Sequence, residues 1–425
     1  MSNLVNCNLV YKQNFLSVED VPVRDIARQV GTPFYVYSAT AIKSNYEKFV
    51  SCLGDLNHSI FFAVKANSNI AVLKHLANLG AGMDIVSSGE YQRAKAAGVS
   101  GDKIVFSGVG KTKAEITLAI ENGIKQFNVE SEPELNILNS VAQSRNKFVP
   151  VSIRINPDID AQTHEKISTG KSDNKFGIPY NEAIKIFDKA SQFSNLKISG
   201  IAVHIGSQLT DLKPYKRTFL KIAELVGILK SKGHDIKRVD LGGGIGIAYS
   251  ANSKVIDLVD YGKLVKNVLG DLNCEFEFEP GRLIVGNAGL LVCSVIYLKC
   301  LEDRNFMVVD GAMNDLIRPA MYEAYHEVIP IKQDNGGVTM KVDIVGPICE
   351  TGDTFARDRN FPIVSEKDLI AFQSCGAYGA VMSSEYNSRP LIPEVLVQER
   401  KFSIIRSRPP VSSLINRDFI PKWLD

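Results

Sequence analysis

Short apolar segments alternate with longer segments of helical periodicity between about residues 33 and 285 of the chain. Continuous apolar runs of a few residues suit parallel strands that are buried on both faces. The longer segments place apolar residues every three or four positions, as helices that cover a sheet do. The predicted strands are Ile60–Val64, Gly82–Val86, Ile104–Phe106, Gln126–Val129, Val149–Ile155, Ile201–Ile205, Arg238–Leu241 and Phe276–Phe278.

Strand–helix repeats of this number and total length are typical of a TIM-type (β/α)8 barrel, which spans about 250 residues. An open, doubly wound sheet is the alternative α/β architecture. Nothing in the repeat indicates where the order of strands would reverse, so the sequence favours the barrel.

The pattern changes after about residue 285, where strands separated by turn residues replace the helices. The predicted strands of this part are Leu290–Leu298, Phe306–Val309, Val338–Val345, Asp368–Phe372 and Lys401–Arg406, and Leu4–Tyr11 is strand-like as well. We therefore expect a mainly-β, sandwich- or barrel-like domain built from both chain ends. The predicted ranges are 1–32 for the N-terminal segment that joins it, 33–285 for the barrel and 286–425 for the C-terminal β domain.

Charge and cysteine usage narrow the possible functions. The 425 residues carry 49 basic and 47 acidic side chains, for a net charge of +2, without a long block of one sign. This balance argues against a nucleic-acid or membrane surface. The seven cysteines and six histidines lack the spacings of disulfide frameworks or metal sites. No secretory signal is recognisable at the start, so a cytoplasmic location is expected.

Candidate catalytic side chains fall at the C-terminal ends of the predicted barrel strands, where barrel active sites are built. Lys65 ends an apolar strand, and an amine in such surroundings can carry a cofactor as a Schiff base. Glu279 follows the last strand, and a carboxylate there can keep a pyridine ring nitrogen protonated, a contact worth roughly 1.5–3 kcal/mol. The competing interpretations are a solvated surface lysine and a carboxylate that caps a turn.

A phosphate site is predicted next to these two residues. Gly242–Gly244 ends the seventh strand, and Gly281 and Arg282 follow the eighth. Barrels commonly bind phosphate at the loops after these two strands. His204 and Arg154, at the ends of strands six and five, are either structural or lie against the ring of a planar cofactor.

Three further segments are ambiguous by themselves. The polar stretch Asn156–Gly177 is longer than a connecting loop requires and suggests a mobile flap over the barrel mouth. Cys349, in a turn rich in glycine and acid, is either an inert buried thiol or a proton donor. Arg318–Tyr322 and Gly376–Gly379 also carry residues that suit a binding site.

Taken together, these motifs resemble the diaminopimelate decarboxylases, a family of barrel-type pyridoxal-phosphate decarboxylases, over essentially the whole chain. The motifs that carry the resemblance are Val64–Asn67, Asp84–Glu90, Asn156–Gly177, His204–Gln208, Gly242–Gly244, Glu279–Arg282, Cys349–Asp353 and Gly376–Gly379. The chain departs from the family at Thr351, where serine is common, and at Lys166, where an aromatic residue is common. Lys166 leaves the detailed chemistry of the flap open.

The resemblance implies a role for each candidate residue. Lys65 would hold pyridoxal 5'-phosphate, His204 would stack on its ring and Glu279 would contact its ring nitrogen. The other implied cofactor-binding residues are Asp84, Arg154, Ser207, Gly244, Gly281, Arg282 and Tyr378. The implied substrate-binding residues are Arg282, Arg318, Tyr322, Glu350 and Tyr378.

The implied reaction is decarboxylation of meso-2,6-diaminopimelate to L-lysine and CO2, the last step of lysine biosynthesis. The resemblance also implies a homodimer in which Cys349 and Glu350 reach the partner subunit's active site, with Cys349 as the proton donor. The rivals are decarboxylases of ornithine, arginine, lysine or carboxynorspermidine, a racemase, and a non-catalytic regulatory relative. Arg318 favours a substrate with a second carboxylate, because a distal amine would prefer an acidic site.

Overall fold

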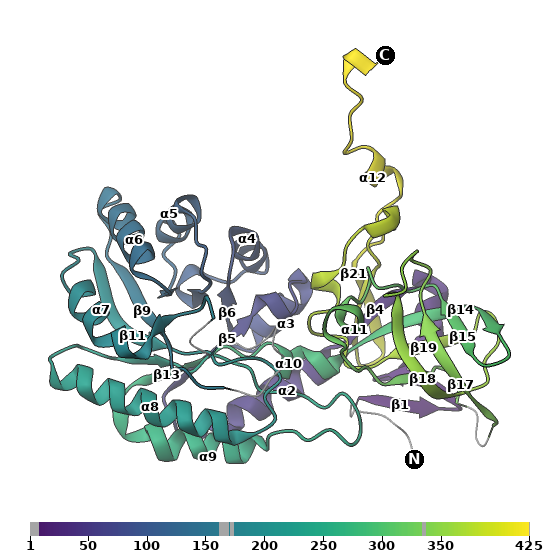
Figure 1. The fold of residues 1–425 in the computed structure, drawn as a ribbon, viewed down its shortest axis with the longest axis horizontal. Helices are drawn as coiled ribbons and strands as arrows, with labels where there is room; N and C mark the ends of the chain where they lie inside the picture. Colours follow the sequence, from purple (N-terminus) through teal and green to yellow (C-terminus); the bar gives the residue numbers. More distant parts are fainter. Residues whose placement is uncertain (1–7, 161–169, 171–173, 334–336, 425) are drawn as a thin grey trace. The chain divides into compact units, whose positions relative to one another are not determined.

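The computed structural model describes residues 8–160, 170, 174–333 and 337–424 (Figure 1). The chain divides into two compact units, which we describe separately. The barrel unit comprises Lys43–Ile247 and Lys254–Ile284, and the β unit comprises Met1–Ile42, Ala248–Ser253 and Val285–Asp425.

The barrel unit is a closed ring of parallel strands. In chain order they are β5 (His58–Ala63), β6 (Gly82–Ile85), β7 (Ile104–Phe106), β8 (Gln126–Val129), β9 (Val149–Asn156), β11 (Leu196–Ala202), β12 (Arg238–Asp240) and β13 (Glu275–Phe278), and the short β10 (Ile178–Pro179) adds to β9. The ring closes because β8 pairs with β9 and β13 pairs with β5. Both closures confirm the predicted barrel and exclude the open sheet.

Helices surround this ring, as the helical periodicity predicts. They are α2 (Ala39–Leu53), α3 (Ile70–Asn78), α4 (Ser88–Ala96), α5 (Lys113–Glu121), α6 (Glu132–Ser144), α7 (Ala183–Ala190), α8 (Leu212–Ser231), α9 (Leu258–Leu269) and α10 (Arg282–Val285). Their starts follow the capping rules: Thr112 and Glu115 form a capping box on α5, and Asp211 and Asp257 cap α8 and α9 through their side chains. These caps fix where each βα loop ends.

The sixth barrel strand differs from its prediction. It was expected at Ile201–Ile205, but β11 begins at Leu196 and ends at Ala202. The polar residues Lys197 and Ser199 in its first half hide the strand from a search for apolar runs. His204 consequently lies beyond the strand rather than within it. Lys65 likewise follows β5, in the 3-10 turn Val64–Ala66.

The β unit joins both ends of the chain, as predicted. Its larger sheet has the order β18-β17-β15-β14-β4-β20-β21, and β19 links β14 to β16. The strands are β4 (Phe34–Ser38), β14 (Gly289–Cys300), β15 (Asn305–Val309), β16 (Val328–Pro330), β17 (Thr339–Val345), β18 (Thr354–Pro362), β19 (Leu369–Phe372), β20 (Glu394–Gln398) and β21 (Lys401–Arg406). β4 pairs with β14 and β20 although it lies inside the range 33–285 that the sequence assigned to the barrel.

The N-terminal segment supplies part of the core of the β unit. It forms a small antiparallel sheet of β1 (Leu9–Lys12), β2 (Phe15–Val18) and β3 (Val21–Pro22), followed by α1 (Val23–Val30). Apolar residues of these elements, among them Leu16 and Ile26, belong to one buried cluster with Val292 of β14 and Val395 of β20. The unit also contains the short helices α11 (Arg318–Tyr322) and α12 (Ser412–Ile415). None of the helices in the described ranges is long and apolar enough to cross a membrane.

Candidate active site

Lys65 faces a buried carboxylate at the C-terminal end of the barrel strands. Its Nζ lies 3.3 Å from Oδ2 of Asp84, the penultimate residue of the neighbouring strand β6, which is fully buried. The lysine side chain keeps 37% of its surface exposed. The 3-10 turn after β5 therefore delivers an accessible amine next to a fixed negative charge.

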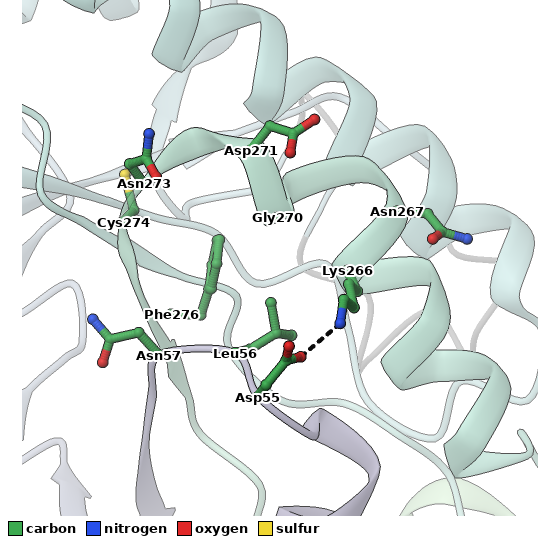
Figure 2. A pocket seen from close by; sticks show the side chains of 10 residues that line it. All are labelled: Asp55, Leu56, Asn57, Lys266, Asn267, Gly270, Asp271, Asn273, Cys274 and Phe276. Atoms are coloured by element: carbon green, nitrogen blue, oxygen red, sulfur yellow. Dashed lines mark hydrogen bonds and ion pairs between the residues drawn. The ribbon is translucent and has the colours of Figure 1, made fainter.

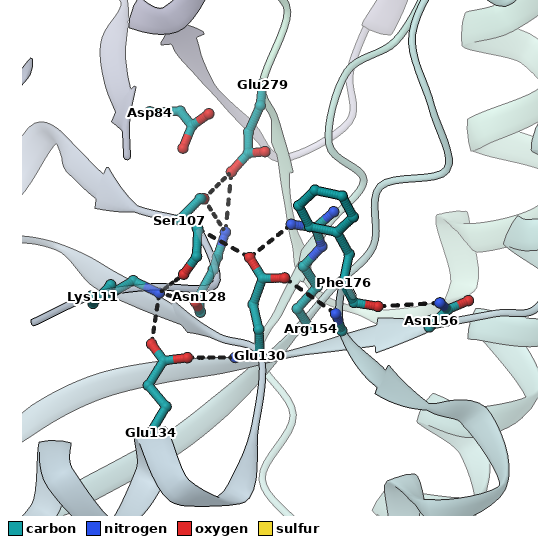
Figure 3. Close-up of polar contacts among 12 residues, drawn as sticks. Asp84, Ser107, Lys111, Asn128, Glu130, Glu134, Arg154, Asn156, Phe176 and Glu279 are labelled. Atoms are coloured by element: carbon teal, nitrogen blue, oxygen red, sulfur yellow. Dashed lines mark hydrogen bonds and ion pairs between the residues drawn. The ribbon is translucent and has the colours of Figure 1, made fainter. Parts of the chain in front are cut away.

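Three buried carboxyls gather around this position. Glu279, directly after β13, accepts hydrogen bonds at Oε1 from Ser107 Oγ at 3.2 Å and Asn128 Nδ2 at 3.1 Å (Figure 3). Burial raises the pKa of Glu279 well above its usual range, and the negative charges of Asp240 and Asp84 raise it further. Burial also raises the pKa of Asp240. The site thus holds more carboxyls than its own cations could balance if all of them were ionised.

The glycine-rich turn after β12 packs tightly against the neighbouring strand ends. Gly244 has a φ of +96°, and a Cβ there would lie 2.2 Å from the carbonyl oxygen of Gly206. A Cβ at Gly243 would lie 2.3 Å from the carbonyl oxygen of Glu279. Glycine is required at both positions because the backbones approach so closely. The turn is therefore brought to the same place as the residues that follow β11 and β13.

A cation and a hydroxyl complete this corner of the site. Arg282, at the start of α10, donates from Nη2 to Ser207 Oγ at 3.0 Å. Gly281 lies between Glu279 and Arg282, where a Cβ would come within 2.8 Å of the Ala66 side chain. An arginine beside a hydroxyl and a glycine turn is a suitable environment for a phosphate.

His204 is neutral in this environment. Burial, supported by the positive charges of Lys65 and Arg154, lowers the pKa of His204 well below its usual value. Its Nδ1 accepts a hydrogen bond from the backbone N–H of Gly243 at 3.2 Å, so the ring proton resides on Nε2. The glycine-rich turn therefore holds the imidazole in one orientation.

Glu130 ties Arg154 to the base of the long loop, an arrangement that the sequence did not reveal. Its Oε1 accepts from Arg154 Nη1 at 2.8 Å and from the backbone N–H of Gly108 at 3.0 Å, and its Oε2 accepts from that of Gly177 at 3.1 Å (Figure 3). Phe176 places its ring 5.0 Å from the Arg154 guanidinium. The predicted flap Asn156–Gly177, including Lys166, lies mostly outside the described residues, and its motion stays a prediction.

In the β unit, Arg318 is buried among neutral partners. Its Nη1 donates to Tyr249 Oη at 2.8 Å and lies 3.1 Å from His326 Nε2. His326 Nδ1 pairs with the carbonyl oxygen of Gln373 at 2.8 Å, so Nδ1 carries the proton and Nε2 accepts from Arg318. Within the described part of the chain, Arg318 forms no ion pair with an acidic side chain. A buried guanidinium without an acidic partner can bind an anionic ligand, because the ligand would compensate its charge.

The other predicted residues of the β unit are more open. Cys349 and Glu350 are exposed in a turn that Asp353 organises by accepting from the backbone N–H groups of Ile348 and Met313, each at 2.7 Å. Tyr386 Oη donates to Glu350. Tyr322 is half-buried at the end of α11, and Tyr378 adopts a positive φ of 56° in the loop after β19.

A surface pocket opens at the opposite ends of two barrel strands (Figure 2). It lies where the chain enters β5 and β13, and an ion pair between Asp55 and Lys266 at 2.7 Å crosses part of it. Its lining residues are Asp55, Leu56, Asn57, Lys266, Asn267, Gly270, Asp271, Asn273, Cys274 and Phe276. Lys65 and Glu279 follow the C-terminal ends of the same two strands, so this pocket does not belong to the candidate active site.

The residues of the barrel unit fit pyridoxal phosphate. Oδ1 of Asp84 is buried and has no hydrogen-bond partner among the described residues, and the nearby Glu279 lacks a sufficient counter-charge. A protonated ring nitrogen would supply the missing positive charge. The glycine turn, Ser207 and Arg282 suit its phosphate, and Lys65 suits its aldehyde. No group of three or more acidic, histidine or cysteine side chains in the described ranges is arranged to bind a metal ion.

Comparison with known proteins relates the whole chain to one family. Residues 39–286 match the family model described as the pyridoxal binding domain of pyridoxal-dependent decarboxylases. The diaminopimelate decarboxylase of Zymomonas mobilis is 46% identical over 417 residues, which cover 97% of this chain and 99% of the relative. That of Vibrio cholerae is 47% identical over 400 residues, covering 94% of this chain and 95% of the relative.

A solved structure gives the same relation. The diaminopimelate decarboxylase of M. jannaschii, crystallised in co-complex with L-lysine, superposes with a TM-score of 0.94 at 36% identity and covers 99% of this chain and 100% of its own. Sequence and fold therefore agree over both units. The chain belongs to the diaminopimelate decarboxylases, a family of pyridoxal-dependent decarboxylases.

Proposed function

We propose that the chain catalyses the pyridoxal-phosphate-dependent decarboxylation of meso-2,6-diaminopimelate to L-lysine and CO2, as a cytoplasmic carboxy-lyase of lysine biosynthesis. The observation that carries this proposal is the pairing of an accessible Lys65 amine with buried, electron-rich carboxyls at one end of the barrel. The family relation supplies the substrate, because the related enzymes bear that name.

In the barrel unit, Lys65 would hold the cofactor through its amine, and Asp84 would keep that amine in place. Glu279 would accept a hydrogen bond from the protonated ring nitrogen, the neutral His204 would stack on the ring, and Arg154 would support it. Ser207, Gly244, Gly281 and Arg282 would surround the phosphate, and the family resemblance adds Tyr378 to this set. This division of roles rests on residue types and on the family resemblance.

The reaction breaks one carbon–carbon bond and forms one carbon–hydrogen bond. Pyridoxal phosphate, when bound, provides an electron-accepting ring that stabilises the negative charge left on the α-carbon. CO2 would leave with neither bonding electron, and Sγ of the partner subunit's Cys349 would give a proton to the same carbon. The Lys65 amine would be available to hold the cofactor again once lysine has left. Closure of the loop 156–177 would exclude water from these steps.

Arg318 decides the choice of substrate in this proposal, together with Arg282, Tyr322, Glu350 and Tyr378. Its guanidinium is buried without an acidic partner in the described ranges, so a second carboxylate on the substrate would compensate its charge. A diamine or guanidino substrate would place a second cation there.

Replacing Arg318 with methionine should raise KM for meso-diaminopimelate by about 10- to 150-fold, the equivalent of the roughly 1.5–3 kcal/mol that a charged hydrogen bond contributes. The change in kcat should be smaller, because the distal carboxylate does not react. Steady-state kinetics measure both quantities. Arg400→Met, at an exposed arginine of the same unit, is the matched control. An unchanged KM with a fully folded variant would remove Arg318 from this role.

Replacing Glu279 with glutamine should lower kcat by about 10- to 150-fold, because the neutral amide loses a charge-assisted contact worth roughly 1.5–3 kcal/mol. Glu279→Asp keeps the charge but moves it away from the ring by one methylene group. Its kcat should therefore lie between that of the parent and that of Glu279→Gln. The measurement is kcat at saturating cofactor, with the melting temperature as the check on folding. A glutamine variant as fast as the parent would contradict the assigned contact.

The direct test of function is CO2 release by the cofactor-loaded protein from meso-diaminopimelate, lysine, ornithine and arginine, each supplied separately. We expect release from diaminopimelate alone, with L-lysine as the product. Release from a substrate without a second carboxylate would keep the reaction class and overturn the argument from Arg318. Cofactor binding without release from any of the four would instead favour a non-catalytic protein.

A further inference from the structure

The interior of the barrel is unusually polar beneath the candidate active site. Barrel interiors are generally filled with bulky branched side chains, and a buried polar group is costly unless it is hydrogen-bonded. Here five polar side chains of β8, β12 and β13 and the residue after it are almost inaccessible to solvent. They are Gln126, Asn128, Asp240, Glu277 and Glu279. Buried polar side chains in such number must find their hydrogen-bond partners inside the barrel.

Polar contacts connect these side chains in a row that begins at Lys125 and leads to Asn128. Lys125 Nζ lies 3.2 Å from Glu277 Oε1, and Glu277 Oε2 accepts from Gln126 Nε2 at 2.9 Å. Gln126 Nε2 also donates to Asn128 Oδ1 at 2.8 Å. Because its oxygen is held by Gln126, the Asn128 amide must direct its nitrogen toward the active site.

The Asn128 nitrogen serves two carboxyls at once. It lies 2.8 Å from Asp240 Oδ2. It also donates to Glu279 Oε1 at 3.1 Å and to Ser107 Oγ at 3.2 Å, and Figure 3 draws these two contacts. Because both oxygens contact the same nitrogen atom, they lie at most about 5.9 Å apart. Two carboxyls this close repel each other when both are ionised, and a proton on one of them removes the repulsion.

We propose that Asn128 is a positioning residue that holds Asp240 and Glu279 as a pair sharing one proton, with Glu279 turned toward the cofactor's ring nitrogen. The inference rests on the proposed function for the contact between Glu279 and the ring. A pair with one proton presents a single negative charge to the ring nitrogen, where two ionised carboxyls would repel each other and a fully protonated pair would offer no charge. Gln126 holds the Asn128 amide in this orientation by donating a hydrogen bond to its oxygen.

Other charges act on the pair from each neighbouring element. Asp84 of β6 disfavours ionisation, and Lys65 beyond β5 favours it. Glu277 lies behind the pair on β13, and its own charge is opposed by burial and by Asp240 and supported by Lys125 and Arg238. Burial raises the pKa of Asp240, as it does that of Glu279, which supports a proton held by the pair. Burial also raises the pKa of Glu277 to about 7, so Glu277 adds a carboxyl band of its own near neutral pH.

Infrared spectroscopy of the full-length protein tests the shared proton, first without cofactor and then with pyridoxal phosphate added. At neutral pH we expect a C=O band of a protonated carboxyl in the cofactor-free protein. Asp240→Asn and Glu279→Gln should each shift or remove this band, since both residues share the proton. Absence of the band, or a band that one of the two variants leaves unaltered, overturns the pair.

The role of Asn128 is tested by Asn128→Leu, which removes the donor at similar size. The midpoint for loss of the carboxyl band should rise by about one pH unit, because a hydrogen bond to the charged form is lost. With cofactor bound, the pH dependence of its visible absorbance should shift as well, and kcat should fall about 10-fold with KM unchanged. Unshifted midpoints in a folded variant overturn the assignment of Asn128.

Two further variants make the result specific. Ser152→Ala removes a buried hydroxyl on the same face of β9 as Arg154 that has no hydrogen-bond partner in the described ranges, and it should leave both midpoints unchanged. Gln126→Met removes the hydrogen bond that orients the Asn128 amide but leaves the amide in place. It should shift both pH midpoints in the same direction as Asn128→Leu, but by a smaller amount. It replaces Asn128→Leu if that variant fails to fold. The infrared measurement needs no substrate. A failure of the decarboxylation test can therefore be distinguished from a failure of the proton-sharing pair.

Discussion

Replacing Lys65 with alanine is expected to lower kcat by about 1,000-fold or more and to abolish the visible absorbance of covalently held cofactor, because the variant has no amine to attach it. The position supports this expectation. Lys65 follows a strand whose last four residues are buried, and its Nζ is 3.3 Å from Asp84. Absorbance spectra of the cofactor-loaded protein and CO2 release from meso-diaminopimelate measure the two effects.

Lys65→Arg separates the covalent role from the electrostatic one. Arginine retains a positive charge beside Asp84, but its guanidinium stays protonated and cannot serve as the nucleophile. We therefore expect this variant to fold as stably as the parent and to lose activity to the same extent as Lys65→Ala. If Lys65→Arg keeps more than a tenth of the parent's kcat, Lys65 acts through its charge and not through its amine.

The arrangement of strands could be predicted from the sequence because buried parallel strands are locally apolar. Ile104–Phe106 and Gln126–Val129 were predicted with the bounds that the structure has. The predicted start of β11 lies five residues too far along the chain, because the polar residues Lys197 and Ser199 interrupt its first half. β4 was missed although it lies at the start of the range assigned to the barrel, because its partners β14 and β20 lie more than 200 residues away. Such pairing leaves no local pattern.

The residues that support the candidate site were harder to predict than those that form it. Lys65 and Glu279 stand at strand ends, where a local motif marks them. Gln126 and Asn128 occupy alternate positions of a strand that was read as apolar, and that alternation is the signal that could have found them. Their partners Asp240 and Glu277 come from other strands, so the network exists only once the ring has closed.

Replacing Cys349 with alanine should lower kcat by about 10²- to 10⁴-fold, the range over which a positioned general acid contributes. In the single chain this thiol is exposed, in a turn that Asp353 holds through two backbone hydrogen bonds. A proton donor in open solvent would be bypassed by water, so the proposal requires that a second subunit enclose it. Cys349→Ser, with a weaker acid of similar size, should retain part of the activity that Cys349→Ala loses.

Mixing the two inactive variants tests that requirement. If Lys65 of one subunit works with the partner subunit's Cys349, random reassociation of equal amounts of Lys65→Ala and Cys349→Ala chains makes half of the dimers mixed. Each mixed dimer contains one site with both native residues, so about a quarter of the parent activity should return. Cys300→Ala, at another exposed cysteine of the β unit, should be fully active before mixing. If activity does not return although mixed dimers form, Lys65 and Cys349 serve the same chain, and the enclosure of the thiol must then come from within the subunit.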